Sequence, residues 1–279
     1  MGVAITPDGT KAYVNNGRDG TVSVINTATN TVSATITVGN PFGVAITPDG
    51  TKAYVTNAVN GTVSVINTAT NTVSATIAAS SNPMGVAITP DGTKAYVTNF
   101  SDNTVSVITT ATNTVSATIA ASSNPMGVAI TLDGTKAYVT NVNGGTVSVI
   151  NTATNTVSAA VTVGSGPFGV AITPDGTKAY VTNQGDDNVS VIDTATGSVS
   201  ATITVGGSPF EVAITPDGTK TYVTNQGDGT VSVINTATTT VSATITVGDG
   251  PYGVVITPDG TKAYVTNRRD GSVSVIKII

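Results

Sequence analysis

Carboxylates, hydroxyls, amides and a few cations are the only side chains here that could do chemistry, because the sequence contains no cysteine, histidine or tryptophan. This composition excludes disulfides, Cys–His and Ser-His-Asp nucleophile systems, histidine-ligated haem and the usual zinc and copper sites. The remaining acid–base candidates are carboxylates such as the adjacent Asp186 and Asp187, and Glu211. A cation-dependent lyase or lactonase would need several acids to converge in a cleft. The spacing permits convergence without indicating it, so we predict no catalytic residue, no metal site and no cofactor.

The composition favours strands and turns. Hydrophobic residues make up 39% of the 279 residues and charged residues only 10%, with Thr, Val, Ala, Ser, Gly and Asn dominant. The apolar residues come in short alternating runs and never as eighteen in succession, so we expect no membrane insertion. Because no charged and apolar leader precedes the first strand-like run, we expect either a cytoplasmic chain or one whose signal has been removed.

The sequence repeats itself seven times. The spacing between equivalent tyrosines is 41 residues once and 42 residues five times, which matches one propeller blade and not a helical repeat. The repeated tyrosines are Tyr13, Tyr54, Tyr96, Tyr138, Tyr180, Tyr222 and Tyr264.

A complete repeat contains four strand-like runs, which we name A, B, C and D. In residues 43–78 they are 43–47, 52–57, 62–67 and 72–77. The A–B connection, Pro48-Asp49-Gly50-Thr51, presets φ with proline and offers a glycine for positive φ, so A and B should pair antiparallel. Four antiparallel strands per repeat predict an all-β fold, a seven-bladed β-propeller formed by the whole chain as a single domain. The approximate blades are 1–39, 40–81, 82–123, 124–165, 166–207, 208–249 and 250–279.

Run B carries the most specific motif. Tyr-Val-Thr-Asn occurs in six repeats, and Tyr13-Val14-Asn15-Asn16 is the exception. Over essentially its whole length the chain resembles the YVTN-repeat propellers known from archaeal surface-layer proteins and from secreted or periplasmic bacterial proteins. The resemblance implies an extracellular or cell-surface setting, but it implies no reaction, because the shared residues are strand and turn residues. WD40 propellers are excluded, since their signature needs His and Trp.

The repeats differ from one another mainly in the B–C loops and D–A links, which should emerge on the same face of the disc. We call this face the loop face and the opposite one, with the A–B and C–D connections, the turn face. Loops on a rigid scaffold often carry binding residues, so the loop face is the candidate functional surface. The alternative is neutral drift of solvated turn residues.

The formal net charge of −5 falls on the loop face, where eight acids and three arginines lie. Acids concentrate in blades five and six, and the arginines lie in blades seven and one. Such a field disfavours nucleic acid and favours cationic groups or divalent ions, although a merely solubilising face is the alternative. The candidate binding residues here are Asp186, Asp187, Asp228, Arg18, Arg268 and Arg269.

A ring of large apolar residues begins the A strands. Because strand A should be innermost, these side chains are expected at the channel mouth. They either grip an apolar or sugar-ring ligand together with Glu211, the one carboxylate that replaces a glycine there, or plug the axis. The candidates are Phe42, Met84, Met126, Phe168, Phe210 and Tyr252, with Met1 at the equivalent position of the first repeat.

Blade seven should lack its outer strand, because its C run, 272–276, is followed only by Lys277, Ile278 and Ile279. The chain then has 27 strands. Either a strand upstream of Met1 closes the ring, or the open edge mediates self-association.

Three functions remain from the sequence. The first is a non-enzymatic surface-layer or cell-envelope scaffold that contacts an envelope protein or glycan through the loop face. The second is a carbohydrate- or peptide-binding module at the channel mouth. The third, least supported by the residues, is the cation-dependent enzyme.

Overall fold

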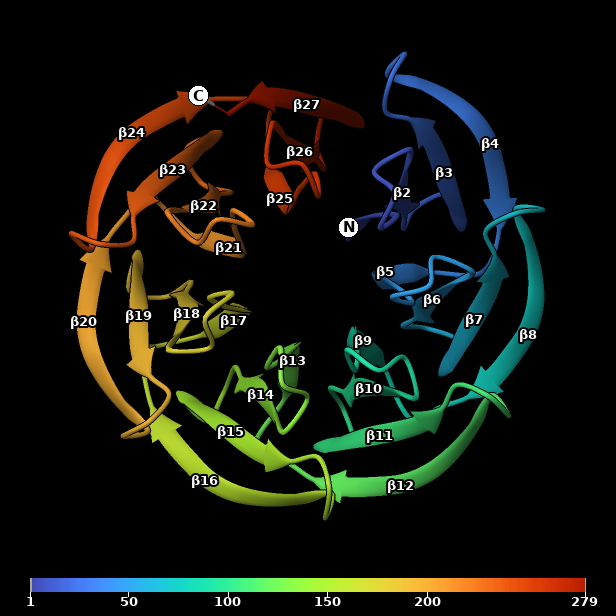
Figure 1. Cartoon of the computed structure of the whole chain (residues 1–279), viewed down its shortest axis with the longest axis horizontal. Helices are drawn as coiled ribbons and strands as arrows, with labels where there is room; N and C mark the ends of the chain where they lie inside the picture. Colours follow the sequence, from blue (N-terminus) through green and yellow to red (C-terminus); the bar gives the residue numbers. More distant parts are fainter. Residues whose placement is uncertain (1, 279) are drawn as a thin grey trace.

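The computed structural model describes residues 2–278, in which every regular element is a β-strand. Seven antiparallel sheets surround a central axis, so the fold is the predicted seven-bladed β-propeller (Figure 1). Six sheets have four strands, and the last, β25-β26-β27, has three, as the sequence predicted. No helix in residues 2–278 is long and apolar enough to cross a membrane.

The A runs form the innermost strands, with their free edges toward the axis (Figure 1). Six of them begin with proline, which such an edge position tolerates because no ladder hydrogen bond is lost there. These strands are β1 (Val3–Ile5), β5 (Pro41–Ile46), β9 (Pro83–Ile88), β13 (Pro125–Ile130), β17 (Pro167–Ile172), β21 (Pro209–Ile214) and β25 (Pro251–Ile256).

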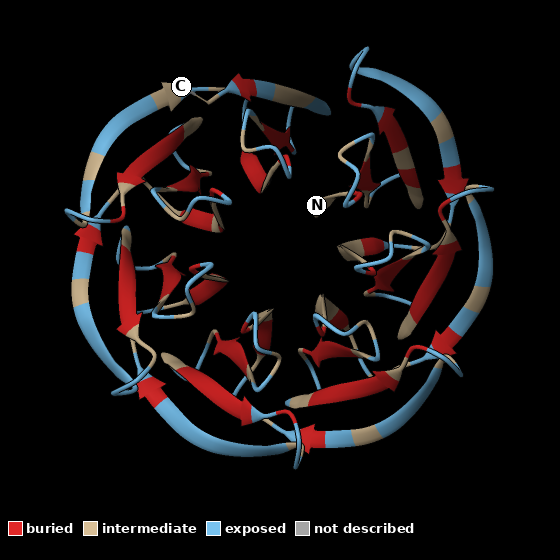
Figure 2. Ribbon diagram, viewed as in Figure 1, coloured by how far each residue is buried: buried red, intermediate tan, exposed pale blue. Residues whose placement is uncertain are grey.

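The B runs form the second strands and are the most buried elements, because both of their faces pack against neighbouring blades (Figure 2). This explains why Ala-Tyr-Val-Thr reads as a nearly continuous buried run instead of an alternating one. The second strands are β2 (Lys11–Asn16), β6 (Lys52–Asn57), β10 (Lys94–Asn99), β14 (Lys136–Asn141), β18 (Lys178–Asn183), β22 (Lys220–Asn225) and β26 (Lys262–Asn267).

The C and D runs complete each blade. C strands are buried in six blades, whereas D strands lie at the rim and are mostly exposed (Figure 2). The C strands are β3 (Thr21–Asn26), β7 (Thr62–Asn67), β11 (Thr104–Thr109), β15 (Thr146–Asn151), β19 (Asn188–Asp193), β23 (Thr230–Asn235) and β27 (Ser272–Lys277). The D strands are β4 (Thr31–Thr37), β8 (Thr72–Ala78), β12 (Thr114–Ala120), β16 (Thr156–Thr162), β20 (Ser198–Thr204) and β24 (Thr240–Thr246).

The core consists of apolar clusters between adjacent blades. Between blades two and three, for example, Tyr54, Val65 and Ile77 pack against Val97 and Ile108. Each blade therefore buries its apolar faces only by standing beside the next, which makes the ring the stable unit.

Hydrogen bonds on the turn face also link neighbouring blades. The Tyr54 hydroxyl donates to Asn113 Oδ1 at 2.7 Å, and Lys52 Nζ donates to the Thr110 carbonyl at 2.9 Å. The same bonds cross the seam between blades seven and one, where Tyr264 donates to Asn30 Oδ1 at 2.7 Å. Packing is thus supplemented by hydrogen bonds where the ring closes.

Candidate functional site

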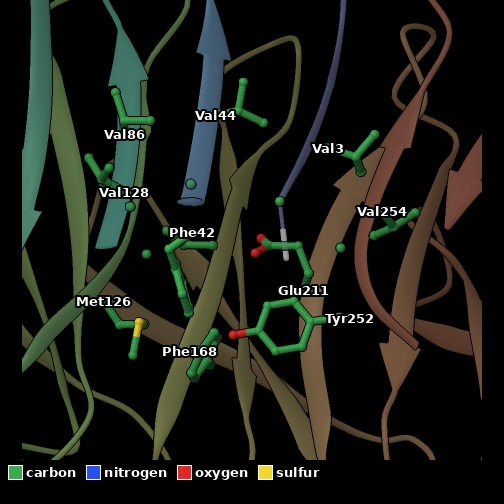
Figure 3. A pocket seen from close by; sticks show the side chains of 16 residues that line it. Val3, Phe42, Val44, Val86, Met126, Val128, Phe168, Glu211, Tyr252 and Val254 are labelled. Carbon is green, nitrogen blue, oxygen red and sulfur yellow. The ribbon is translucent and has the colours of Figure 1, made fainter. Parts of the chain in front are cut away.

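The apolar residues at the start of the inner strands meet on the axis as one cluster, which we call the plug (Figure 3). The Phe168 and Phe210 ring centroids are 3.6 Å apart, those of Phe210 and Tyr252 are 3.8 Å apart, and Phe42 meets Tyr252 edge-on at 5.8 Å. The four most buried members are only 5–7% exposed. Packing of this kind fills the mouth, so little aromatic surface remains there for a stacked sugar. The buried members are Met126, Phe168, Phe210 and Tyr252; Phe42 and Met84 pack against them, and Met1 lies outside the described residues.

Two residues that were not predicted from the sequence, Phe100 and Val142, and the predicted Arg268 surround the plug. Phe100 and Val142 pack against it, and the Arg268 guanidinium lies 5.7 Å from the Tyr252 ring centroid, within cation–π range. Each is the first residue of its B–C loop. A comparison of that one loop position across the seven repeats would have found Phe100 and Val142.

The threonine of each Tyr-Val-Thr-Asn motif ties the inner strands together beneath the plug. In blade four, Thr140 Oγ1 accepts from Gly127 N at 2.8 Å and donates to the Phe168 carbonyl of the next blade at 2.6 Å. In blade one, Asn15 Nδ2 donates to the Phe42 carbonyl instead. The hydroxyl therefore serves two backbone groups, one in each of two neighbouring inner strands, that the bulges in those strands leave outside the ladder.

A cavity of about 170 Å³ lies on the axis on the inner side of the plug (Figure 3). A layer of glycines and a layer of valines, including Val44 and Val128, line it. The glycine layer is needed because neighbouring blades approach closely: a Cβ on Gly127 would lie 2.4 Å from the Phe168 carbonyl oxygen. The sequence placed Glu211 at the mouth, and the structure shows it in this deeper glycine layer.

Glu211 is the one carboxylate in the lining of this cavity. Its Oε1 accepts a long 3.4 Å hydrogen bond from Val212 N, and its surroundings are mainly apolar. Desolvation raises the pKa of Glu211 to about 7, although the Val212 N–H acts in the opposite direction. The carboxyl group is therefore poised to take up or release a proton near neutral pH. Burial likewise raises the pKa of Tyr252 well above its usual value.

The loop-face acids hold neighbouring D–A links: Asp186 and Asp228 hold the link that enters their own blade, and Asp187 holds the link that leaves it. Asp186 Oδ2 accepts from Ser165 N at 2.8 Å, and Asp187 Oδ1 accepts from Ser208 N at 2.7 Å. Asp228 repeats the first arrangement with Gly207 N at 2.6 Å. All three acids remain exposed. A structural role thus accounts for their positions, and their role in binding a partner stays a prediction.

The predicted acids do not converge. Asp186 and Asp187 are exposed on the loop face, whereas Glu211 lines the axial cavity, whose lining includes neither of them. Residues 2–278 contain no group of three acidic side chains placed to hold a metal ion. Arg18, Arg268 and Arg269 are exposed on the loop face, and Arg269 Nη1 lies 3.1 Å from Asp249 Oδ1.

Comparison with known proteins supports the architecture. A hydrazine synthase structure from Kuenenia stuttgartiensis is 26% identical to this chain, with a TM-score of 0.93 over 99% of this chain and 94% of the other. Because 1650 chains of solved structures match, the architecture alone selects no function. No curated protein sequence matches the chain. The model of the YNCE-like beta-propeller family matches residues 3–99 and 134–226. These matched residues are more than half of the sequence, so the chain belongs to the YNCE-like beta-propeller family.

Proposed function

We propose that the protein is a non-enzymatic interaction module that docks a partner protein on its loop face, as a scaffold component of the cell surface or a surface layer. One observation carries this proposal. The turn-face residues are repeated and used for the ring's own bonds, whereas the loop face displays the differences between blades.

The turn face illustrates this use of its polar groups. In blade two, Asp49 Oδ1 accepts from Thr47 Oγ1 at 2.5 Å and from Thr51 N at 3.0 Å. These bonds hold the pKa of Asp49 below its usual value. Lys52 donates to the neighbouring blade, as described above. These polar groups already have hydrogen-bond partners within the ring, and they are the same in every blade. They therefore offer little basis for recognising one particular binding protein.

The loop face has two chemically different sectors. Blades two to four present Val59, which is 79% exposed, and the partly exposed Phe100 and Val142 near the plug. Blades five and six present most of the acids with exposed side chains, and blade seven presents one acid beside its two exposed arginines. A partner with basic residues beside an apolar patch would match both sectors, and the charges would steer its approach. The acids are Asp186, Asp187, Asp228, Asp249 and Asp270.

A peptide array and a glycan array, each probed with the purified protein, test this proposal. A triple variant, Asp186→Lys, Asp187→Lys and Asp228→Lys, alters the acidic sector. Lys52→Gln and Lys94→Gln together form the matched turn-face control. We expect basic, apolar-flanked peptides to bind the wild type and the control and to bind the triple variant at least tenfold more weakly. Equal binding by all three proteins, or binding to glycans alone, contradicts the proposal.

An extracytoplasmic location is part of the proposal, and it rests on the Tyr-Val-Thr-Asn resemblance. Fractionation of cells that express the natural gene, followed by detection of the protein, tests it. Recovery from the envelope or medium is expected, and recovery from the cytoplasm alone contradicts it. The likeness to hydrazine synthase concerns the architecture, and no reaction is transferred to this chain from it.

A second candidate function is the binding of a small molecule in the axial cavity beside Glu211. The cavity, at about 170 Å³, is smaller than pockets for drug-sized ligands, which favours a single small polar or cationic ligand over a glycan chain. A thermal-shift screen with calcium, magnesium, small amines and monosaccharides tests it. A ligand should raise the midpoint of the wild type and have a reduced effect on Glu211→Gln.

A further inference from the structure

Glu211 stands in a layer that is otherwise made of glycine. In blades two to four, a Cβ at this position would lie 2.3–2.4 Å from a carbonyl oxygen of the next blade, so a side chain in this layer is costly. A carboxylate adds the cost of its desolvation. The other six blades close the ring with glycine, so ring closure does not require this side chain. Those glycines are Gly2, Gly43, Gly85, Gly127, Gly169 and Gly253.

The Glu211 carboxylate has no counter-ion among residues 2–278. The one hydrogen bond that it accepts there is the 3.4 Å bond from Val212 N, and the ion pair of these residues joins Arg269 to Asp249 on the loop face. The attraction of the chain's N-terminal amine is the smallest of the three effects on the pKa of Glu211. An ionised carboxylate has about four acceptor sites, so most of those on Glu211 are free for a ligand.

The carboxylate faces the axial cavity. Glu211 lies between the plug and the valine layer, with its carboxylate directed into the space that they enclose (Figure 3). The residue is partly exposed, and its exposed surface belongs to the lining of this cavity. The volume of about 170 Å³ corresponds to roughly five water molecules at about 30 Å³ each. A molecule of about five non-hydrogen atoms therefore fits beside the carboxylate.

The inner strands present backbone groups to the same cavity. The register makes Ala45 and Tyr54 a hydrogen-bonded pair, so the N–H and C=O of Val44 point away from β6 toward the axis. The Val212 N–H has the same direction, because it reaches Glu211 Oε1. The valine layer thus adds carbonyl acceptors and N–H donors to the one carboxylate. The equivalent valines in the lining are Val3, Val86, Val128, Val170 and Val254.

Solvent reaches the cavity from the turn face. The plug closes the loop-face end, whereas the two residues that follow the valine, such as Ala45 and Ile46, are partly exposed in all seven inner strands. A small ligand can therefore reach Glu211 without displacing the plug. Gly2 and Val3 are only two of the 16 lining residues, so blades two to seven form most of the cavity whatever precedes Gly2.

We propose that the axial cavity binds one small organic cation that carries a primary ammonium group. The ammonium donates to the Glu211 carboxylate and to backbone carbonyls of the valine layer, and a short carbon chain packs on the inner side of Phe168 and Tyr252. One carboxylate balances one positive charge. A calcium ion takes six to eight oxygen ligands, commonly from more than one carboxylate, so it fits this site less well. The inference rests on the second candidate function above and deepens it by naming the class of ligand.

Calorimetric titration of the intact protein with propylammonium tests the proposal. Tetramethylammonium supplies the charge without N–H donors, 1-propanol supplies the shape without the charge, and calcium tests a metal ion. We expect propylammonium alone to bind. Its affinity should fall about tenfold or more in Glu211→Gln, because a hydrogen bond to a charged group is lost. Glu211→Gly, which restores the residue of the other six blades and should fold, should show the same loss.

Two further proteins separate this inference from its neighbours. At physiological salt, where distant charges are screened, the loop-face triple variant should bind propylammonium as the wild type does, which separates the site from the proposed function. A protein with a short extension before Met1 should also bind with unchanged affinity. Loss of binding in that protein would show that preceding residues occupy the cavity, and would overturn the inference.

Other results would also overturn it. If 1-propanol or tetramethylammonium binds as tightly as propylammonium, or if calcium binds and propylammonium does not, the class of ligand is wrong and the second candidate function stands. If propylammonium does not bind in the millimolar range, the inference fails, whereas a monosaccharide that stabilises the wild type in the thermal-shift screen would still support the second candidate function. Equal affinity in the wild type and both Glu211 variants would place the bound amine elsewhere.

Discussion

At the scale of single residues, the seven copies act as natural variants of one another. Four tyrosines donate a hydrogen bond to an asparagine in the next blade, and each of those asparagines has positive φ. Tyr180 has no such partner because Thr239 stands at the asparagine position, and its buried hydroxyl is unpaired within residues 2–278. Thr239 also has a φ of 54°, which is unfavourable for a β-branched residue.

Thr239→Asn should therefore stabilise the protein. The substitution relieves the backbone strain and gives the Tyr180 hydroxyl an acceptor, and together these effects should raise the free energy of unfolding by about 1–3 kcal/mol. Chemical denaturation measures the change. Asn155→Thr, the reverse substitution in blade four, should destabilise by a similar amount.

The hydrogen bond can be separated from the strain. In a Tyr180→Phe background, Thr239→Asn should retain only the gain from backbone relief. An undiminished gain in that background would show that no hydrogen bond to Tyr180 forms.

Glu211 should give the protein a distinctive pH dependence. Its pKa of about 7 in the folded protein exceeds the ordinary value of 4.5, so the folded state holds the proton more tightly. Stability from this group is complete below about pH 4.5 and is lost as the pH rises toward 7. Glu211→Gln should abolish this loss, which denaturation curves at pH 4, 6 and 8 would show.

The turn-face aspartates supply the internal reference for that experiment. Threonine hydroxyls and backbone N–H groups hold the pKa values of Asp49 and its equivalents below 3.8, so their contribution is lost only in more acidic solution. The aspartates contribute equally to the stability of the wild type and of Glu211→Gln, so their contribution cancels when the two stabilities are subtracted. A wild-type curve that parallels that of Glu211→Gln from pH 4 to 8 would contradict a raised pKa.

At the scale of elements, the threonines of the Tyr-Val-Thr-Asn motifs, which we call the threonine belt, explain why the B strands carry a polar residue in a fully buried run. Thr140 is fully buried and serves Gly127 N and the Phe168 carbonyl. Without its hydroxyl, two backbone groups at a blade interface would lose their partners. The belt therefore fixes the height of each inner strand relative to the next, and with it the position of the plug.

Thr140→Val should lower the free energy of unfolding by about 2–4 kcal/mol, because valine keeps the shape and removes both hydrogen bonds. Thr140→Ser keeps the hydroxyl and should cost less than half as much. Denaturation of the two variants measures the contrast. Equal losses would mean that the methyl group, and not the hydroxyl, stabilises this interface.

The sequence predicted the elements well where local chemistry decides them. The Pro-Asp-Gly-Thr turns and the four strand runs of a complete repeat were predicted correctly, because each depends on neighbouring residues, and the three-stranded seventh blade followed from counting the runs. The hydrogen bonds by which Asp186 and Asp228 hold the D–A links could not be predicted from the sequence. Predicting them requires knowing that residues 21 positions apart lie side by side.

At the scale of the whole molecule, the seam between blades seven and one should be the least protected part of the ring. Every other C strand has a strand on both sides, whereas β27 has one only on the inside. Such an edge opens without disrupting a complete sheet.

Hydrogen exchange should therefore be faster in 272–277 than in the equivalent segments 62–67 and 104–109. Mass spectrometry of peptic fragments from the protein measures this directly. Equal protection in the three segments would show that the ring opens only as one cooperative unit, and that its seam is no weaker than its other interfaces.

The sequence by itself determined the seven-bladed ring, its innermost strands, its two unlike faces and its open edge. These features follow from the period, the turn residues and the strand direction, which are local properties repeated seven times. Only the tertiary structure decided that Phe168, Phe210 and Tyr252 meet as a plug and that Glu211 lies behind it in a cavity. Equivalent residues of different blades meet on the axis only once the ring is closed, so the distances between them are set by ring geometry and not by any one repeat.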